Sequence, residues 1–463
     1  MKKNIFSKFL NFLILIVLFF IVIKYFLSHE FYKFFYLKFI FLIGIYYLLF
    51  YSLKKVRDYF IIFLFSSIIS FYTIEILFYF SSRVIIDNIK IRSSQAEKLG
   101  IDFDTRSKFQ FYQDYLKQDS SAVPSIPPND YFVNYSYLKN KSDDLYSIAG
   151  ISNRSTIFCN EGGERVVYNS DRHGFRNKDF YWNNDQIDIV LLGDSLAQGA
   201  CVNDEDTIHE RIIYYTKKSF LNLGYQGHGP LMQLASLKEY AKLKKPKQVI
   251  WFYSETNDID NLIYEYQWDI FKKYLTNSQH TQNLLDRQKE IDFEHIELID
   301  KIYSDASLGD RQYKTREKTD FFFDLKSIIK LHKLRQFISF FIPRKYSLTV
   351  DYYSPLDTFK IYEQIIDEAN NVVKSWGGEL YFVYYPHAAR YFNKIIHPFP
   401  LTKYNHMIKL MKKKNIHIID LKKEVFEKAE DVKGLYPLRI SGHPDERGYD
   451  LVASYISKVL LNE

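Results

Sequence analysis

The most informative segment of the chain is IDIVLLGDSLAQGACV at residues 187–202. Residues 187–192 form a nearly continuous apolar run, which is typical of a β-strand buried on both faces of a parallel sheet. Gly193, Asp194 and Ser195 follow at once and begin a small, polar turn. A strand that ends in a sharp turn holding a serine is one way in which hydrolase folds expose a nucleophile. The rest of the chain must then supply a base and an oxyanion hole.

Further strand-like runs follow at 219–223, 247–254, 379–386 and 416–420, and helical patterns lie between them. The clearest helical pattern spans 354–378, with a Ser-Pro start, apolar residues at helical spacing and a double-Gly stop. This alternation predicts an α/β domain with a doubly wound, parallel five-stranded sheet and flavodoxin-like layering. Catalytic groups are expected at the carboxyl ends of its strands.

Before this domain, three long apolar runs occupy residues 9–27, 35–53 and 59–80. Each is about as long as the ~20 residues that cross a hydrocarbon core, so we expect three transmembrane helices. Basic residues precede the first run and join the second to the third, which predicts a cytoplasmic N-terminus and an exported domain after residue 82. We therefore expect an anchor in a bacterial inner membrane and a periplasmic or extracytoplasmic domain. The first run lacks a convincing cleavage site, which favours an anchor over a removed signal peptide.

The expected domain boundaries follow from these patterns. Residues 1–82 form the membrane anchor, and 83–185 form a helix, a linker and a small β/turn region. Residues 186–463 form the α/β domain, with a helical insertion at about 262–350. The insertion either packs its apolar face on the core as a helical subdomain or forms a lid or membrane-surface contact.

Charge, motif content and cysteine content limit the classes of ligand and the cellular compartment to be expected. The formal net charge is +7, from 62 basic and 55 acidic residues without a long basic block, so nucleic-acid binding is not indicated. No metal-ligand spacing and no phosphate-cradling glycine loop is present, so we expect neither a metal nor a cofactor. Cys159 and Cys201 are the two cysteines, and an oxidising compartment would let them form a disulfide. The alternative is two unrelated free thiols.

Polar motifs stand beyond two of the other strand-like runs and before the last helical pattern. NLGYQGHGP (222–230) is a glycine cluster, SETNDID (254–260) places Asn257 after a strand, and SGHPDERGYDLVA (441–453) places His443 in a turn. With Gly193-Asp194-Ser195, these motifs resemble the four blocks of the SGNH (GDSL-type) hydrolase family. The resemblance covers about 187–263 and 375–463 and implies an ester-cleaving serine hydrolase.

The resemblance implies a role for each block. Ser195 is the nucleophile and His443 is its base. The oxyanion donors are the backbone N–H groups of Ser195 and Gly227 and the side-chain amide of Asn257. Gly224 is the alternative register for Gly227.

The chain departs from the family pattern at two positions. Glu255 stands where the family has a glycine, and Ile440 stands where it has the aspartate that orients the histidine. Asp445 is poorly placed for that task, so we expect either a backbone carbonyl to orient His443 or a reduced activity. Asp194 and His387 are candidate substrate contacts, with a capping role and a structural role as their alternatives.

The leading functional hypothesis is a membrane-anchored extracytoplasmic serine esterase or O-acyltransferase. It would remove or transfer acetyl esters of a cell-envelope polysaccharide or glycolipid, with a membrane partner as acyl donor where the reaction is transfer. One alternative is a lipid esterase or thioesterase. The other is a carbohydrate-binding or assembly protein that keeps the fold but is catalytically weak or inactive.

Overall fold

The computed structural model describes residues 66–77, 88–128, 145–303, 328, 331, 334, 358–392 and 401–462. By its internal contacts the chain divides into two compact units, Met1–Arg83 with Phe322–Arg335, and Val84–Phe321 with Gln336–Glu463. Of the three expected membrane spans, the structure describes only residues 66–77, and the rest lies outside the described residues. In the part of the chain that the structure describes, no helix is both long enough and apolar enough to cross a membrane.

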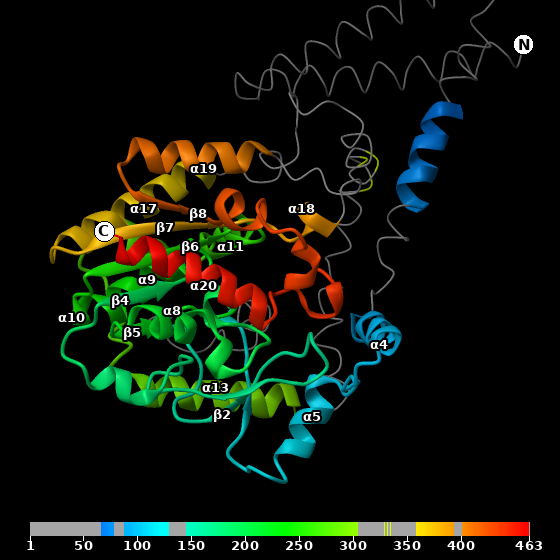
Figure 1. Cartoon of the computed structure of the whole chain (residues 1–463), viewed down its shortest axis with the longest axis horizontal. Helices are drawn as coiled ribbons and strands as arrows, with labels where there is room; N and C mark the ends of the chain where they lie inside the picture. Colours follow the sequence, from blue (N-terminus) through cyan, green and yellow to red (C-terminus); the bar gives the residue numbers. More distant parts are fainter. Residues whose placement is uncertain are drawn as a thin grey trace, which may run out of the picture. The chain divides into compact units, whose positions relative to one another are not determined.

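The second unit contains the five-stranded parallel sheet that the sequence predicts. The strands are adjacent in the order β5-β4-β6-β7-β8, and every neighbouring pair is parallel (Figure 1). This order reverses beside the first strand of the sheet in the chain, β4, as in flavodoxin-like doubly wound folds. The strand bounds are β4 Ile189–Leu192, β5 Phe220–Asn222, β6 Gln248–Ser254, β7 Glu379–Tyr385 and β8 His417–Asp420.

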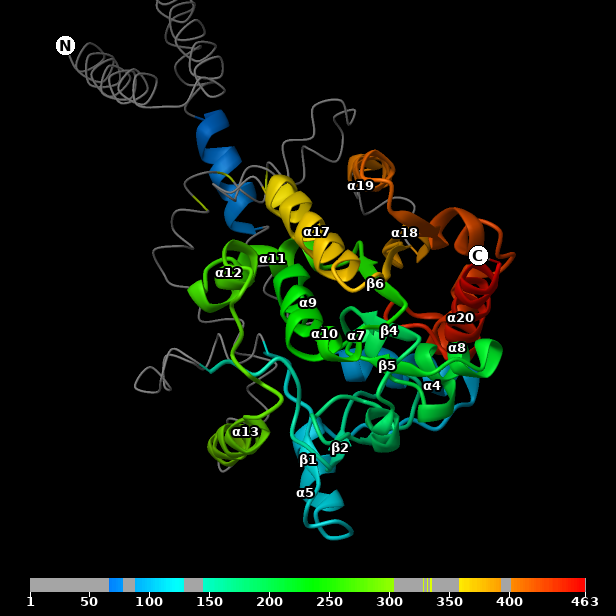
Figure 2. The ribbon, with the colours of Figure 1, turned by 90° about the vertical axis from the view of Figure 1, so that its left-hand side faces the viewer.

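Alternate side chains of each strand enter two separate apolar clusters, one on each face of the sheet. Ile189 and Leu191 pack in the cluster that includes α8 and α20, whereas Val190 and Leu192 pack in the cluster that includes α9, α17 and α19. Figure 2 shows α8 and α20 on one side of the strands and α9 and α17 on the other. Burial on both faces is the physical reason for the continuous apolar runs in the sequence. The bounds are α8 Ile208–Thr216, α9 Pro230–Ser236, α17 Thr358–Lys374, α19 Leu401–Lys413 and α20 Glu446–Leu461.

The region before the sheet packs against it, where the sequence led us to expect a linker. Val123 and Ile126 are buried in the same apolar cluster as Val190. The proline and serine residues of 121–128 resemble a linker in composition, but the apolar residues between them are buried. The elements are α4 Asn88–Leu99, α5 Lys108–Tyr115 and a small sheet of β1 Val123–Pro124, β2 Ser155–Ile157 and β3 Val167–Asn169.

The predicted insertion is helical as far as the structure describes it. The helices α11 Asp258–Glu265, α12 Asp269–Thr276 and α13 Gln288–Tyr303 follow β6. Phe271 and Tyr274 of α12 are fully buried, so this part packs on the core. Except for 328, 331 and 334, residues 304–357 lie outside the described residues, and with them most of the expected lid segment.

Short helical elements connect the longer helices and strands. They are α7 Ser195–Gln198, α10 Lys242–Lys244, α18 Ala389–Phe392, η2 Asp179–Asn183, η3 Asp204–Asp206, η4 Leu237–Ala241, η7 Lys422–Phe426, η8 Val432–Leu435 and η9 Pro437–Arg439.

Candidate active site

Ser195 lies directly beyond the carboxyl end of β4, as the first residue of the short helix α7. The turn before it needs a glycine, because a Cβ on Gly193 would lie 2.6 Å from the Cβ of Ala197 and 2.9 Å from the Cβ of Phe252. Asp194 caps α7, since its side chain accepts a hydrogen bond of 2.9 Å from the backbone N–H of Leu196. The backbone thus turns sharply between strand and helix and places the serine at the carboxyl edge of the sheet.

His443 lies in hydrogen-bond contact with Ser195, although the two residues are far apart in the sequence. The distance from Ser195 Oγ to His443 Nε2 is 2.8 Å. Asp445, which follows His443, caps helix α20 by accepting a hydrogen bond of 2.9 Å from the N–H of Gly448. Its carboxylate is therefore engaged away from the imidazole, as its sequence position led us to expect.

Glu161, which the sequence analysis missed, orients His443. Its Oε1 lies 2.9 Å from His443 Nδ1, and its Oε2 accepts a hydrogen bond of 2.9 Å from the backbone N–H of His443. A carboxylate can only accept hydrogen bonds, so Nδ1 carries the proton and Nε2 is free to accept one from Ser195. The expectation that a backbone carbonyl takes the place of the aspartate is wrong, because a carboxylate from another segment is there.

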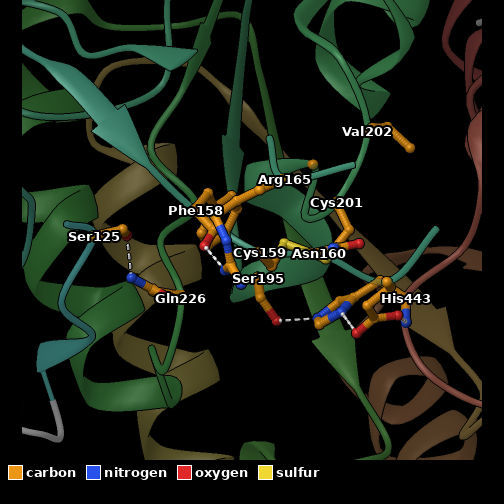
Figure 3. The surroundings of a disulfide bond; sticks show 12 residues. Ser125, Phe158, Cys159, Asn160, Arg165, Ser195, Cys201, Val202, Gln226 and His443 are labelled. Carbon is orange, nitrogen blue, oxygen red and sulfur yellow. Dashed lines mark hydrogen bonds and ion pairs between the residues drawn. A yellow bond between two sulfur atoms is a disulfide. The ribbon is translucent and has the colours of Figure 1, made fainter. Parts of the chain in front are cut away.

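The Glu161 loop, residues 158–166 between β2 and β3, is held in place by several contacts. Cys159 and Cys201 form a disulfide, which joins this loop to the residues after α7. Figure 3 shows the disulfide beside Ser195, with His443 facing the serine. The side chain of Asn160 accepts a hydrogen bond from the N–H of Gly163 at 2.9 Å and donates one to the carbonyl of Asp104 at 3.0 Å. Glu161 is thus presented on a loop with little freedom to move.

The pKa values of Glu161 and His443 are shifted by burial and by nearby charges. Burial alone would raise the pKa of Glu161, but the charge and hydrogen bonds of His443 and the charge of Arg92 outweigh it and lower that pKa. Burial would lower the pKa of His443, but Glu161, with help from Asp194, outweighs burial and the opposing charge of Arg92 and raises that pKa above its ordinary 6.5. The acid is therefore ionised, and the base becomes neutral only above its ordinary range.

The predicted oxyanion donors lie on the loops that follow β5 and β6. Gly227 has φ +80°, a left-handed conformation that glycine adopts without strain. The Nδ2 of Asn261 lies 3.3 Å from the carbonyl oxygen of His228, the residue after Gly227, and so connects this loop to α11. Asn257 is the residue before α11, and its side-chain amide acts to lower the pKa of the Asp194 carboxyl. The oxyanion role of Ser195, Gly227 and Asn257 stays a prediction.

Asp194 is more deeply buried than its candidate role as a substrate contact would need. Its exposed fraction is 1%, and burial raises its pKa despite the hydrogen bond from Leu196. This placement favours the capping alternative. Burial, together with the nearby charge of Asp194, also raises the pKa of Asp258 well above its ordinary value.

Glu255, the residue in the family's glycine position, is fully buried on its side chain and forms an ion pair with Arg390. Burial would raise the pKa of Glu255, but Arg390 outweighs it and lowers that pKa. Glu255 also accepts a hydrogen bond of 3.0 Å from the backbone N–H of His387. Glu255 therefore holds the residues that follow β7 in position. A substrate contact of His387 stays a prediction.

Glu161, Cys201 and His443 are the only group of side chains, within the described ranges, whose spacing could suit a metal ion. The sulfur of Cys201 is bound in the disulfide, and Glu161 and His443 are hydrogen-bonded to each other. Each of the three side chains therefore already has a partner, and they do not form a free ligand set.

Comparisons with known proteins found similar chains among solved structures. No protein-family model and no curated protein sequence matches the chain. Among solved structures, it is similar to a protein from Desulfitobacterium hafniense assigned to the G-D-S-L lipolytic family, with 15% identity, a TM-score of 0.31 and coverage of 60% of this chain and 99% of that one. It is also similar to a lipase/acylhydrolase from Enterococcus faecalis, with 13% identity, a TM-score of 0.32 and coverage of 60% and 96%.

A further similar structure is a two-domain esterase that is active on acetylated mannans. Its identity with this chain is 12% and the TM-score is 0.29, and the match covers 61% of this chain and 51% of the esterase. These structures are described as a lipolytic protein, a lipase/acylhydrolase and an esterase, but similarities this low do not transfer an activity or a substrate to this chain. The functional conclusion has to come from the side chains of the site.

Proposed function

We propose that the chain is a serine esterase or O-acyltransferase of the SGNH type. The observation that carries this proposal is the continuous relay of two hydrogen bonds, 2.8 Å from Ser195 to His443 and 2.9 Å from His443 to Glu161. A serine, a base and an orienting carboxylate are the parts of a nucleophilic acyl-transfer site.

The geometry supports a two-step reaction. His443 accepts the proton of Ser195 as the oxygen attacks the ester carbonyl, and the Glu161 carboxylate stabilises the imidazolium that forms. Donors at Ser195, Gly227 and Asn257 would bind the oxyanion, and each such donor is typically worth about 3–4 kcal/mol. His443 then gives its proton to the leaving alcohol, and an acyl-enzyme remains on Ser195. Water or a sugar hydroxyl, deprotonated by His443, attacks this ester and releases the serine.

We further propose that the protein is anchored in the bacterial cytoplasmic membrane with this site outside the cytoplasm. The apolar runs at 9–27, 35–53 and 59–80 support the anchor, and the Cys159–Cys201 disulfide supports an oxidising compartment. The substrate class proposed for this location is an acetylated envelope polysaccharide or glycolipid. A membrane protein that supplies acyl groups would be needed only for transfer.

The alternative of a non-catalytic carbohydrate-binding protein loses its main support. That support was the missing aspartate at Ile440, and Glu161 now occupies the corresponding place beside the imidazole. A binding protein has little need for a serine, a base and an ionised carboxylate in one relay.

The test is hydrolysis of p-nitrophenyl acetate by the full-length protein in detergent. We expect turnover in the wild type and background rates in Ser195→Ala and His443→Ala. The control is Ser375→Ala, an exposed serine before the amino end of β7. A fluorophosphonate probe should label the wild type on Ser195 and leave Ser195→Ala unlabelled. A folded wild type that neither turns over nor takes the label would refute the proposal. Long-chain acyl esters and thioesters in the same assay distinguish a lipid esterase or thioesterase.

A further inference from the structure

Arg92 connects the segment that carries the acid to the segment that carries the base. It lies on α4, and its side chain is 10% exposed. Its Nη1 donates to the backbone carbonyl of Glu161 at 2.9 Å, and its Nη2 lies 3.2 Å from Glu161 Oε2. The same Nη2 donates to the carbonyl of Ser441, two residues before His443, at 3.2 Å. One guanidinium therefore holds both sides of the Glu161–His443 hydrogen bonds.

The fit between these segments is close. A Cβ on Gly442 would lie 2.2 Å from Glu161 Oε2 and 2.6 Å from Arg92 Nη2. Only a residue without a side chain lets the carboxylate and the guanidinium approach the backbone before His443 so closely. The Arg92 guanidinium is therefore closely packed against the Glu161 carboxylate and the backbone before His443.

Arg92 also tunes the charge of the relay. It faces Glu161 and lowers the pKa of that carboxyl, and its positive charge opposes protonation of His443. The other charged groups that act on His443, Glu161 and Asp194, both favour protonation. Removing Arg92 should therefore leave His443 protonated up to a higher pH.

We propose that Arg92 is a positioning residue for the Ser195–His443–Glu161 relay, so that helix α4 completes the active site. The inference rests on the proposed function. Arg92 need not touch substrate: it fixes the carboxylate that orients the imidazole. Helix α4 follows the third predicted membrane span in the sequence, so the segment between anchor and α/β domain has a part in the chemistry.

The experiment compares Arg92→Met and Arg92→Lys in the full-length protein with Lys98→Met, which removes a charge from the exposed last turn of the same helix. We expect Arg92→Met to lose about 10- to 100-fold in kcat with little change in KM, because misplacement of a catalytic group costs rate and not binding. The acidic limb of its kcat/KM profile should move to higher pH. Arg92→Lys should return the limb toward the wild-type position but recover kcat only in part, and Lys98→Met should match the wild type.

The outcomes separate this inference from the proposed function. If the wild-type activity does not depend on Ser195, the proposed function fails. If it depends on Ser195 but Arg92→Met keeps the wild-type kcat and acidic limb, only the inference about Arg92 fails. If Arg92→Met does not fold, Arg92→Lys decides: a folded Lys variant with wild-type kcat and an unmoved limb would overturn the inference.

Discussion

Replacing Glu161 by glutamine should damage the site more than replacing it by alanine. Both carboxylate oxygens accept hydrogen bonds from His443, Oε2 from the backbone N–H and Oε1 at Nδ1, each at 2.9 Å. Oε2 also faces Arg92 Nη2 at 3.2 Å. In Glu161→Gln, the amide oxygen must stay at the position that faces two fixed donors. The NH₂ group then faces Nδ1, which has to become an acceptor.

The consequence is the wrong tautomer of His443. With Nδ1 unprotonated, the neutral ring carries its proton on Nε2 and can no longer accept one from Ser195. The equivalent loss in the Ser-His-Asp template costs about 10⁴ in kcat, or roughly 5 kcal/mol. In Glu161→Ala the imidazole is free to adopt either tautomer, so the loss is that of one charge-assisted hydrogen bond, about 1.5–3 kcal/mol or roughly 10- to 150-fold.

The assay is p-nitrophenyl acetate hydrolysis by full-length wild type, Glu161→Gln and Glu161→Ala, with kcat and KM measured between pH 5 and 9. Thermal unfolding checks that each variant folds. The acidic limb of the wild type should lie above the ordinary histidine value of 6.5, and Glu161→Ala should lower it. If folded Glu161→Gln is as active as Glu161→Ala or more so, the tautomer argument is refuted.

Other consequences can be checked with single measurements. Replacing Cys159 and Cys201 by serine opens a loop with a sequence separation of 42 and should lower the free energy of unfolding by about 4 kcal/mol. It should also lower kcat, because the disulfide holds the loop that carries Glu161. An unchanged melting temperature or kcat would contradict this. Gly442→Ala should lower kcat at least tenfold, because its methyl group displaces Glu161; the measurement is steady-state kinetics, and a wild-type kcat would show that the close approach is unnecessary. Burial lowers the pKa of His228 to about 4, so its contribution to stability is complete above pH 6.5 and declines as the pH falls toward 4. His228→Gln should therefore reduce the loss of stability between pH 7 and pH 5 by about 2 kcal/mol in denaturant titrations, and a loss equal to that of the wild type would speak against it.

The sequence predicts the sheet well because each strand is buried on both faces. All five predicted strands form, and their bounds move by only one or two residues, as for 187–192 against Ile189–Leu192. Ser195 and His443 also come together as their positions predict, since one follows β4 and the other precedes the last helix. Local patterns are sufficient where the fold itself brings strand ends to one edge.

The carboxylate of the relay was not predicted, because its place depends on contacts between distant segments. Glu161 and His443 are 282 positions apart, and no local pattern connects the β2–β3 loop to the turn before α20. One signal was present in the sequence. Cys159 stands two residues before Glu161, and its predicted partner Cys201 follows Ser195 closely. The expected disulfide was therefore already an indication that residues near 159 approach the serine.

The position of Glu161 changes how the region before the α/β domain is understood. An orienting carboxylate is defined by its geometry toward the imidazole and not by its place in the chain, so any segment that reaches Nδ1 can supply it. Here the β2–β3 loop supplies the carboxylate, the disulfide ties that loop to the serine turn, and Arg92 of α4 joins it to the histidine turn. The residues that resemble the SGNH blocks include Ser195 and His443, whereas Glu161 and Arg92, which contact the histidine and its turn, lie in the region before the α/β domain. A fragment limited to 186–463 would keep Ser195 and His443. It would lose Glu161, the carboxylate that holds the proton on Nδ1 of His443 and so leaves Nε2 free for Ser195.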